Sequence, residues 1–102
     1  MNLEQQVYKK LTEVPQGKVT TYTELAKAVG LKNGQRVIGQ IMKKNPYPTI
    51  IPCHRVVNSD GNVGGYAYGG DVKTNMLQKE GIKIQNGKIL DLHKKFHKFT
   101  TS

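Results

Sequence analysis

Two short helical segments joined by a glycine-containing turn lie in the first half of the chain. The first is expected over residues 24–29, because Thr23 is a suitable N-cap and Gly30 a suitable end. The second is expected over residues 35–44, after the turn at Gly34. Its packed apolar residues are expected to be Val37, Ile38, Ile41 and Met42. This order predicts a helix-turn-helix with a second, recognition helix, although any helical pair with a glycine turn gives the same pattern.

Two further helices are expected on either side of this pair. An apolar residue recurs at every fourth position of residues 2–12, which predicts an amphipathic helix. This stripe consists of Leu3, Val7 and Leu11. A fourth helix is expected over residues 72–79, with Asp71 as its cap and Glu80-Gly81 at its end.

Polar turns between short β-prone segments predict two hairpins. Residues 56–57 and Val63 flank a polar turn, and we expect them to form a wing. A second hairpin is expected over residues 82–90, because Asn86-Gly87 favours a tight turn. Together the elements predict an α+β, winged-helix-like domain, with a three-helix core containing the helix-turn-helix, a hairpin wing and a further C-terminal helix.

The length of 102 residues fits one domain with a modest core. We place this domain at residues 1–92 and expect residues 93–102 to be a loosely ordered basic tail. The tail is rich in lysine and histidine, and it would add non-specific attraction to DNA.

The charge balance points to a polyanionic partner. Sixteen Lys and Arg residues against seven Asp and Glu residues give a formal net charge of +9. Such an excess in a small chain favours nucleic acid binding, although a merely soluble basic protein is the plain alternative. One cysteine excludes an intrachain disulfide and fits a reducing cytoplasm. The chain lacks a membrane-length apolar run, a signal region and the spacing of a structural zinc site, so we expect a cytoplasmic protein that acts at the nucleoid or nucleus where DNA is. We also expect it to be a monomer.

The single cysteine, Cys53, lies in an apolar stretch between Pro52 and His54. A thiol must lose its proton to act as a nucleophile, and a neighbouring imidazole or cation promotes that loss. His54 and Arg55 supply one of each. Pro52 restricts the backbone and fixes where the thiol lies. Most lone cysteines are instead small buried hydrophobic residues, and that reading is the alternative.

Several motifs extend this pattern along most of the chain. In chain order they are Gly17-Lys18-Val19-Thr20-Thr21-Tyr22, Arg36 followed by Gly39, Asn45-Pro46, Pro52-Cys53-His54-Arg55-Val56, Gly61, Gly64, Tyr66, Gly69-Gly70, Lys73, Leu77 and Glu80-Gly81. Over about residues 3–90 the chain thereby resembles the O6-alkylguanine-DNA alkyltransferases, also called methylated-DNA–protein-cysteine methyltransferases. The resemblance is to the C-terminal catalytic domain of that family.

The resemblance implies direct and irreversible repair of O6-alkylguanine in double-stranded DNA. The damaged nucleotide would be flipped out of the helix, and its alkyl group would pass once to Cys53, with no cofactor or metal. His54 would act as base, through a water, and Glu80 would orient it. Asn45 would brace the turn, and Tyr22 would assist flipping and hydrogen-bond to the base.

The same resemblance implies a DNA-binding set and a substrate pocket. Arg36 would fill the space left by the flipped base, and Tyr22, Gln35 and Gln40 would also face DNA. The pocket would be lined by Tyr66, Ala67, Pro48 and Val56. Plainer roles are a phosphate-binding or exposed arginine at Arg36, a core tyrosine at Tyr22 and a simple helix-end acid at Glu80.

Two other functions compete with direct repair. A non-catalytic alkyltransferase-like protein binds and flags O6-alkylguanine lesions, but such relatives lack the cysteine of this signature, so Cys53 argues against it. A winged-helix transcription regulator would explain the charge and the helix-turn-helix. It would not explain the pairing of Cys53 with His54 or the glycine-rich loop with Tyr66.

Overall fold

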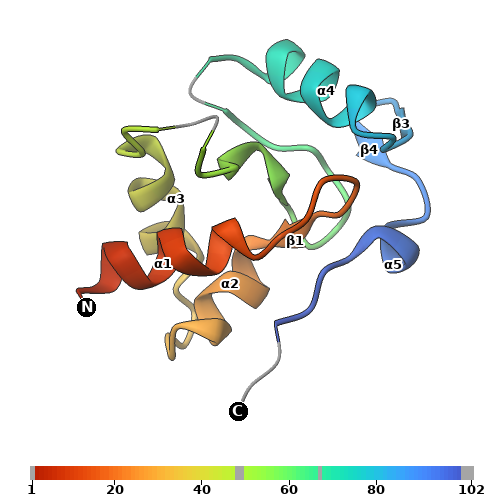
Figure 1. Cartoon of the computed structure of the whole chain (residues 1–102). Coiled ribbons are helices and arrows are strands. Elements are labelled where there is room, and N and C mark those ends of the chain that lie inside the picture. Colours follow the sequence, from red (N-terminus) through yellow and green to blue (C-terminus); the bar gives the residue numbers. More distant parts are fainter. Residues whose placement is uncertain (1, 48–49, 67, 100–102) are drawn as a thin grey trace.

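The computed structural model describes residues 2–47, 50–66 and 68–99, and it confirms the predicted α+β class (Figure 1). In chain order the elements are α1 (Leu3–Thr12), β1 (Thr20–Thr21), α2 (Tyr22–Ala28), α3 (Gln35–Lys43), the 3-10 helix η1 (Cys53–Arg55), β2 (Val56–Val57), α4 (Gly70–Lys79), β3 (Ile84–Gln85), β4 (Lys88–Ile89) and α5 (Leu92–Lys95). No helix in the described ranges is long and apolar enough to cross a membrane.

Helix α1 agrees with the predicted helix over residues 2–12. Asn2 and Gln5 form a reciprocal capping box, in which the Asn2 side chain accepts from the Gln5 N–H at 2.9 Å. Val7 and Leu11 are fully buried against the neighbouring helices. The Tyr8 hydroxyl donates to the backbone carbonyl of Ile41 at 2.9 Å, so a polar contact also ties α1 to α3.

The helix-turn-helix of α2 and α3 is present, but α2 begins earlier than the sequence predicted. Thr21, not Thr23, is its N-cap, because the extended Thr21 backbone lets its hydroxyl accept from the Glu24 N–H at 3.0 Å. In the turn, a Cβ on Gly34 would lie 2.7 Å from the Leu31 Cβ, so close packing requires glycine there. The apolar face of α3 is narrower than expected, because Val37 is 41% exposed.

The predicted hairpin at residues 56–63 is wrong. Val56–Val57 form β2, which pairs in parallel with β1 instead of antiparallel with Val63. Both strands are buried on both faces, as is usual for parallel strands. Residues 58–62 still turn tightly, and the Val63 N–H donates to the Gly87 carbonyl at 2.9 Å. The predicted wing is therefore a loop that leads from the parallel pair towards the second hairpin.

The second predicted hairpin is confirmed, since β3 and β4 pair antiparallel across Asn86-Gly87. Both turn residues have positive φ, at 54° and 76°, as a tight hairpin turn requires. Helix α4 ends at Glu80 as expected, but Asp71 is not its cap. The N-cap is Gly69, which makes no side-chain hydrogen bond, and Asp71 lies exposed in the first turn.

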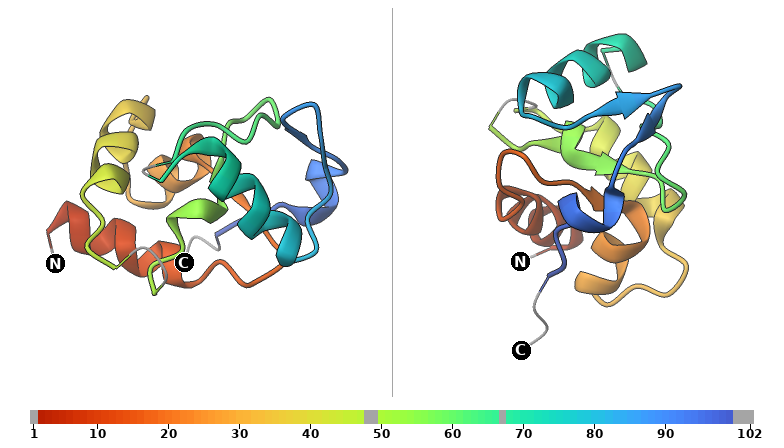
Figure 2. Two further views of the ribbon diagram at one scale, coloured as in Figure 1. Left: turned by 90° about the horizontal axis from the view of Figure 1, so that it is seen from above. Right: turned by 90° about the vertical axis from the view of Figure 1, so that its right-hand side faces the viewer.

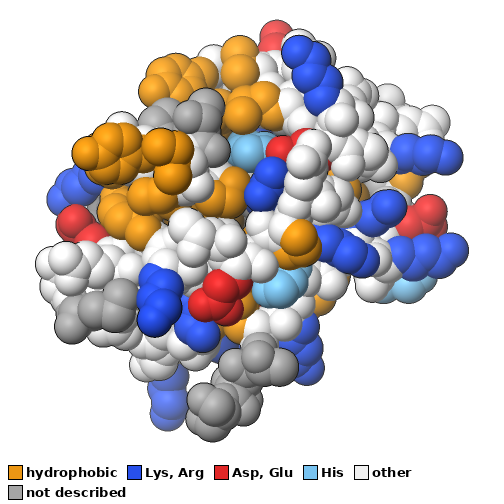
Figure 3. All heavy atoms as spheres, in the orientation of Figure 1, with side chains coloured by type: hydrophobic (Ala, Val, Ile, Leu, Met, Phe, Trp, Pro, Cys, Tyr) orange, Lys and Arg blue, Asp and Glu red, His pale blue; other side chains and the backbone are white. Residues whose placement is uncertain are grey.

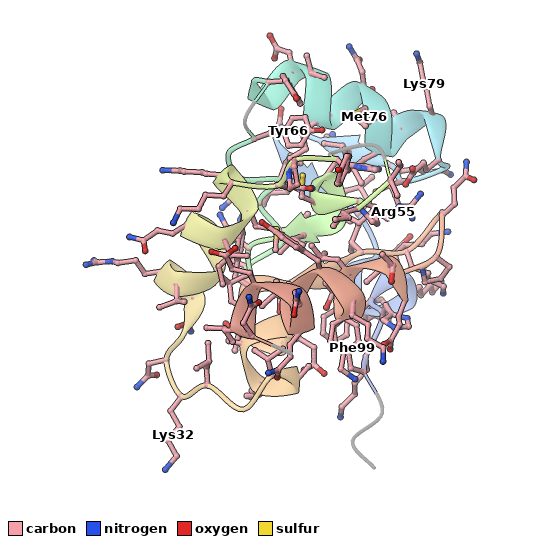
Figure 4. All side chains as sticks on the ribbon, turned by 60° about the vertical axis from the view of Figure 1, so that its left-hand side comes forward. Lys32, Arg55, Tyr66, Met76, Lys79 and Phe99 are labelled. Carbon is pink, nitrogen blue, oxygen red and sulfur yellow. The ribbon has the colours of Figure 1, made fainter. Side chains whose placement is uncertain are left out.

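The C-terminal segment packs on the domain, which differs from the expected loose tail. Helix α5 is followed by a bridge in which the Val19 N–H donates to the Lys95 carbonyl at 2.8 Å. The Phe99 side chain is only 4% exposed and joins the core beside α1 (Figure 4). Apolar residues within this basic stretch therefore anchor residues 92–99.

Strands β1 and β2 lie between two hydrophobic clusters. Figure 2 shows helices α1 to α3 on one side of them and α4 with its hairpin on the other. Val56 joins the helical cluster, whereas Val57 joins the cluster formed with Leu77 and Ile82. Adjacent strand residues point to opposite faces, so two residues of β2 contact both cores. The turn that carries Cys53 directly precedes this junction.

Candidate functional site

Cys53 begins the short 3-10 helix η1 and lines a cleft of about 710 Å³. The Cys53 N–H donates to the Ile51 carbonyl at 2.8 Å, and the Arg55 N–H donates to the Pro52 carbonyl at 3.0 Å. These bonds close two tight turns around the thiol. The Cys53 residue is 7% exposed, so the thiol lies deep in the cleft.

His54 and Arg55, which directly follow Cys53 in η1, form a hydrogen-bonded cluster with Glu80. His54 Nε2 lies 2.9 Å from Glu80 Oε2. Arg55 Nε donates to Glu80 Oε1 at 2.9 Å, and Arg55 Nη2 donates to Glu80 Oε2 at 2.8 Å. Arg55 Nη1 also donates to the Val14 carbonyl at 2.9 Å. The predicted contact between His54 and Glu80 is thus present, and Arg55 pairs with the same carboxylate.

The protonation of this cluster follows from its burial and contacts. Burial lowers the pKa of His54, and this outweighs the opposing effect of Glu80, so the imidazole is neutral near pH 7. Burial raises the pKa of Glu80, but hydrogen bonds from Arg55 and His54 outweigh it and the net shift is downward. A carboxylate at Glu80 can only accept, so His54 Nε2 carries the proton. His54 Nδ1 is left as an acceptor, and it is buried without a partner among the described residues.

The cleft brings residues of the predicted DNA-binding set to the thiol. Tyr22, Gln35 and Arg36 line the cleft together with Cys53. Gln35 and Arg36 open α3 and are exposed, and Gln35 Nε2 donates to Thr23 Oγ1 at 3.2 Å. Gln40 is also exposed on α3, but it is not among the cleft-lining residues.

The aromatic wall of the cleft is formed by tyrosines with protonated hydroxyls. Burial and the nearby Cys53 raise the pKa of Tyr22. Burial, Cys53 and Tyr68 raise the pKa of Tyr66 to about 12. Tyr66 and Tyr68 make an edge-to-face contact with ring centroids 5.5 Å apart. Figure 4 shows Tyr66 below α4 on the side of the Cys53 turn. Both Tyr22 and Tyr66 can therefore donate hydrogen bonds at neutral pH.

The remaining predicted residues have mixed outcomes. Asn45 Nδ2 donates to the Ile51 carbonyl at 2.9 Å, and its Oδ1 accepts from the Tyr47 N–H at 2.9 Å, so it braces the segment before Cys53. Val56 does not line the cleft, because its side chain is fully buried in the helical core. Pro48 and Ala67 lie outside the described residues.

Sequence reasoning assigned no role to several residues at this site. Lys73 is fully buried, and its Nζ donates to backbone carbonyls of Val56 and Gly65. Its place on α4, four residues before the buried Leu77, was a signal that it faces inward. Ser59 also lines the cleft and forms a 3.1 Å hydrogen bond with Thr23. Its chain position gave no signal, because it depends on how the loop after β2 folds back.

Charged and exposed apolar side chains lie on the surface around this cleft. Figure 3 shows hydrophobic side chains gathered over the end of α3 and the loop before α4, with lysine and arginine side chains around them. Exposed apolar residues of these segments are Tyr47, Ile50, Tyr68 and Val72. Within the described ranges, no three His, Cys, Asp or Glu side chains are grouped to hold a metal ion.

Comparison with known proteins gives a family match over most of the chain. Residues 2–82 match the family described as the 6-O-methylguanine DNA methyltransferase, DNA binding domain. The chain is 48% identical over 81 residues to a methylated-DNA–protein-cysteine methyltransferase of Thermococcus sibiricus, covering 78% of this chain and 45% of that protein. It is 40% identical over 96 residues to a bifunctional methyltransferase/endonuclease of Picrophilus torridus, covering 94% of this chain and 32% of that protein.

A solved structure resembles nearly the whole chain. The crystal structure of S. pombe Atl1, in complex with damaged DNA containing O6-carboxymethylguanine, superposes with a TM-score of 0.83 at 33% identity. It covers 96% of this chain and 99% of that one. By contrast, the chain spans half or less of the length of the curated relatives it matches.

The matched family corrects one detail of the sequence analysis. Its description is that of a DNA-binding domain, so the narrower assignment to a C-terminal catalytic domain is not supported. The motifs, the helix-turn-helix and the match over residues 2–82 agree with one another. The chain belongs to the 6-O-methylguanine DNA methyltransferase DNA-binding domain family.

Proposed function

We propose that this protein repairs O6-alkylguanine in double-stranded DNA by moving the alkyl group to Cys53. One observation carries the proposal: Cys53 lines the same cleft as Arg36 and Tyr22, and the residue that follows it, His54, is hydrogen-bonded to Glu80. A binding module would need the cleft, but it would not need a thiol backed by an oriented imidazole. The relatives named as methyltransferases support the same reading.

DNA engagement comes first in the proposed reaction. The alkyl carbon on guanine O6 is enclosed by the base stack, so the nucleotide must leave the helix to reach the thiol. Arg36, exposed at the start of α3, would fill the vacated space, which offsets part of the unstacking cost of a few kcal/mol. Gln35 and Gln40, also exposed on α3, would contact the DNA around this point.

The flipped base would be held by the walls of the cleft. Tyr22 and Tyr66 both keep their hydroxyl protons at neutral pH and would donate to base or phosphate oxygens. Asn45 would keep the segment before Cys53 in place through its two backbone bonds. The cleft of about 710 Å³ falls in the size range of sites that hold small organic groups.

Proton and alkyl transfer would then follow in one displacement. The thiol proton passes, through a water, to His54 Nδ1. Nε2 cannot accept it, because Nε2 already carries a proton that it donates to Glu80. The thiolate electron pair forms the new sulfur–carbon bond. The carbon–oxygen bond breaks with its electron pair on guanine O6, and the restored base takes up the proton that His54 received, so the imidazole is again neutral. The product is a thioether, which no group of the site can hydrolyse, so each molecule acts once and needs no cofactor.

The C-terminal segment would strengthen DNA binding as a second basic element. Residues 83–102 contain five lysines and one aspartate, which is +4 of the formal +9 charge. We propose that the protein binds DNA as a monomer through residues 1–92, with the segment from residue 93 binding further phosphates. Replacing Lys94 and Lys98 by glutamine would then lower the salt dependence of affinity, by about 0.9 in log–log slope for each phosphate that these lysines neutralise. An unchanged slope would contradict this role of the segment.

Lesion binding without transfer is the second candidate. The likeness to Atl1 favours it, because that match spans 99% of a chain solved with damaged DNA. Titrating a duplex that contains O6-methylguanine against the protein distinguishes the two functions. Transfer predicts restored guanine up to one lesion per protein molecule and no further, with none restored by Cys53→Ser. Multiple turnovers, or tight binding with no restored guanine, would contradict transfer by this protein.

A further inference from the structure

Lys73 connects three segments that surround the reactive thiol. It is the only lysine or arginine that is fully buried in the part of the chain that the structure describes. From α4, its Nζ donates to the Val56 carbonyl at 2.6 Å and to the Gly65 carbonyl at 3.1 Å. Val56 opens β2, directly after the Cys53 turn, and Gly65 lines the cleft beside Tyr66.

The charge of Lys73 is unusual for a buried group. No carboxylate of the described residues forms an ion pair with it. Burial lowers the pKa of Lys73 to about 8, and the neighbouring Cys53 opposes this shift. The charge of Lys73 in turn lowers the pKa of His54. Lys73 is therefore close enough to interact electrostatically with both groups of the proposed proton transfer.

Stability alone does not explain a lysine at this position. Burying an ammonium group without a carboxylate is costly, and an apolar side chain of similar length would avoid that cost. The two carbonyls that Lys73 binds belong to different segments: Val56 is held in β2 and in the helical core, whereas Gly65 lies in the glycine-rich loop. Gly64 and Gly69, on either side of Gly65 and Tyr66, have positive φ angles, which glycine adopts without strain. The two bonds from Lys73 tie Gly65 to β2.

We propose that Lys73 is a positioning residue for alkyl transfer, which ties the Gly65–Tyr66 wall of the cleft to the Cys53 turn and directs its charge at the thiol. This inference rests on the proposed transfer reaction and adds to it a residue outside the set of Cys53, His54 and Glu80. Without Lys73, the wall that holds the flipped base would shift relative to the sulfur atom. Misplacement by about 1 Å can cost about 10²-fold in rate.

Lys73→Met tests the proposal, since methionine keeps the length of the side chain and removes both donors and the charge. Lys79→Met is the matched control, because Lys79 lies on the same helix and points away from the body of the protein (Figure 4). Three quantities are compared: the single-turnover rate with O6-methylguanine duplex, the Kd for that duplex, and the rate of thiol alkylation by iodoacetamide. Alkylation by iodoacetamide needs the thiol, but it does not need a flipped guanine held at a fixed position.

We expect Lys73→Met to slow methyl transfer by about ten-fold to 10²-fold. The Kd should stay close to that of the wild type, and the iodoacetamide rate should fall much less than the transfer rate. Lys79→Met should behave as the wild type in all three assays. Transfer at the wild-type rate by Lys73→Met, or an equal loss in both thiol reactions, would overturn the positioning role.

Two further measurements keep the proposal testable if Lys73→Met does not fold. Lys73→Gln keeps N–H donors without the charge and should transfer faster than Lys73→Met but more slowly than the wild type; a wild-type rate would exclude a role for the charge. In the wild-type protein, the ¹⁵N signal of the Lys73 amine should shift when Cys53 is methylated, whereas that of Lys79 should not. An unchanged Lys73 signal would contradict the inference. Failure of the wild type to transfer methyl at all would instead refute the proposed function.

Discussion

Glu80→Gln is the substitution whose consequences the structure defines best. The Glu80 side chain is 12% exposed, and its two oxygens accept three hydrogen bonds, one from His54 and two from Arg55. Glutamine has the same shape but only one acceptor oxygen, and its NH₂ group donates. A glutamine that keeps Arg55 Nε on its oxygen turns that NH₂ towards His54 Nε2. His54 must then carry its proton on Nδ1, where it cannot accept the thiol proton.

The two expected magnitudes follow from this geometry. Loss of His54 as the general base should slow methyl transfer by about 10²–10⁴-fold. Removing one partner of this part-buried, hydrogen-bonded ion pair should cost less than the roughly 3–5 kcal/mol of unfolding free energy lost when a fully buried pair is broken, but more than a surface pair. Such a loss is still a substantial part of the roughly 5–15 kcal/mol that stabilises a domain, so the fold will be weakened as well. Transfer must therefore be measured well below the unfolding midpoint of the variant.

Urea unfolding and single-turnover quench assays measure the two effects separately. Glu13→Gln is the matched control, because Glu13 is 44% exposed and its ion pair with Lys10 spans 4.0 Å on the surface. That control should change neither quantity measurably. If Glu80→Gln costs no more stability than Glu13→Gln, the ion-pair reasoning is wrong. If its transfer rate stays within about three-fold of the wild type, the tautomer reasoning is wrong.

Three other substitutions test separate parts of the proposed mechanism. Arg36→Ala should reduce methyl transfer much more than DNA affinity, because it removes the group that replaces the flipped base; equal losses in a filter-binding and a transfer assay would contradict insertion. The Arg55 charge lowers the pKa of His54, so Arg55→Met should raise that pKa. The pH below which the transfer rate falls should then be higher than in the wild type; an unchanged or lower pH would contradict the role of His54 as base. Gly39→Ala should stabilise α3 by about 0.5–1 kcal/mol in urea unfolding, because a Cβ there meets nothing within 4 Å, yet weaken DNA binding by narrowing the cleft. Unchanged affinity would place the DNA elsewhere.

The pH dependence of stability follows from the same cluster. The pKa of His54 lies below its ordinary value of 6.5 in the folded state, so the unfolded chain takes up that proton more readily. The pKa of Glu80 is also lowered, so its contribution to stability is present above its ordinary value of 4.5 and is lost as pH falls through the folded value. The free energy of unfolding therefore decreases below about pH 6.5 because of His54, and it decreases further below about pH 4.5 because of Glu80.

Local signals were sufficient for most of the helices and for the thiol site. The apolar spacing of α1 and the glycine turn of the helix-turn-helix are encoded within a few residues, and the structure agrees with both. The contact of His54 with Glu80 joins residues 26 positions apart, and the family resemblance supplied it. An acid at the end of α4 is unfavourably placed against the helix dipole, and the structure shows that Glu80 is held there by His54 and Arg55.

The errors arose where distant segments decide the outcome. Val56–Val57 could pair with a nearby strand or with Thr20–Thr21, and nothing local reveals that the parallel partner is available. The cap of α2 is a different case, because the three-residue spacing from Thr21 to Glu24 is a local signal that favours Thr21 over Thr23. The basic charge of the C-terminal segment concealed its apolar anchor Phe99, which is buried on the core.

The decisive measurement for alkyl transfer is the intact mass of the protein after incubation with a duplex containing one O6-methylguanine. We expect every molecule to gain the mass of one methyl group and peptide fragmentation to place that group on Cys53 alone. An undamaged duplex of the same sequence should leave the mass unchanged, and Cys53→Ser should stay unmodified while still binding the lesion. Bound lesion with no mass gain, or methylation at another residue, would contradict transfer to Cys53.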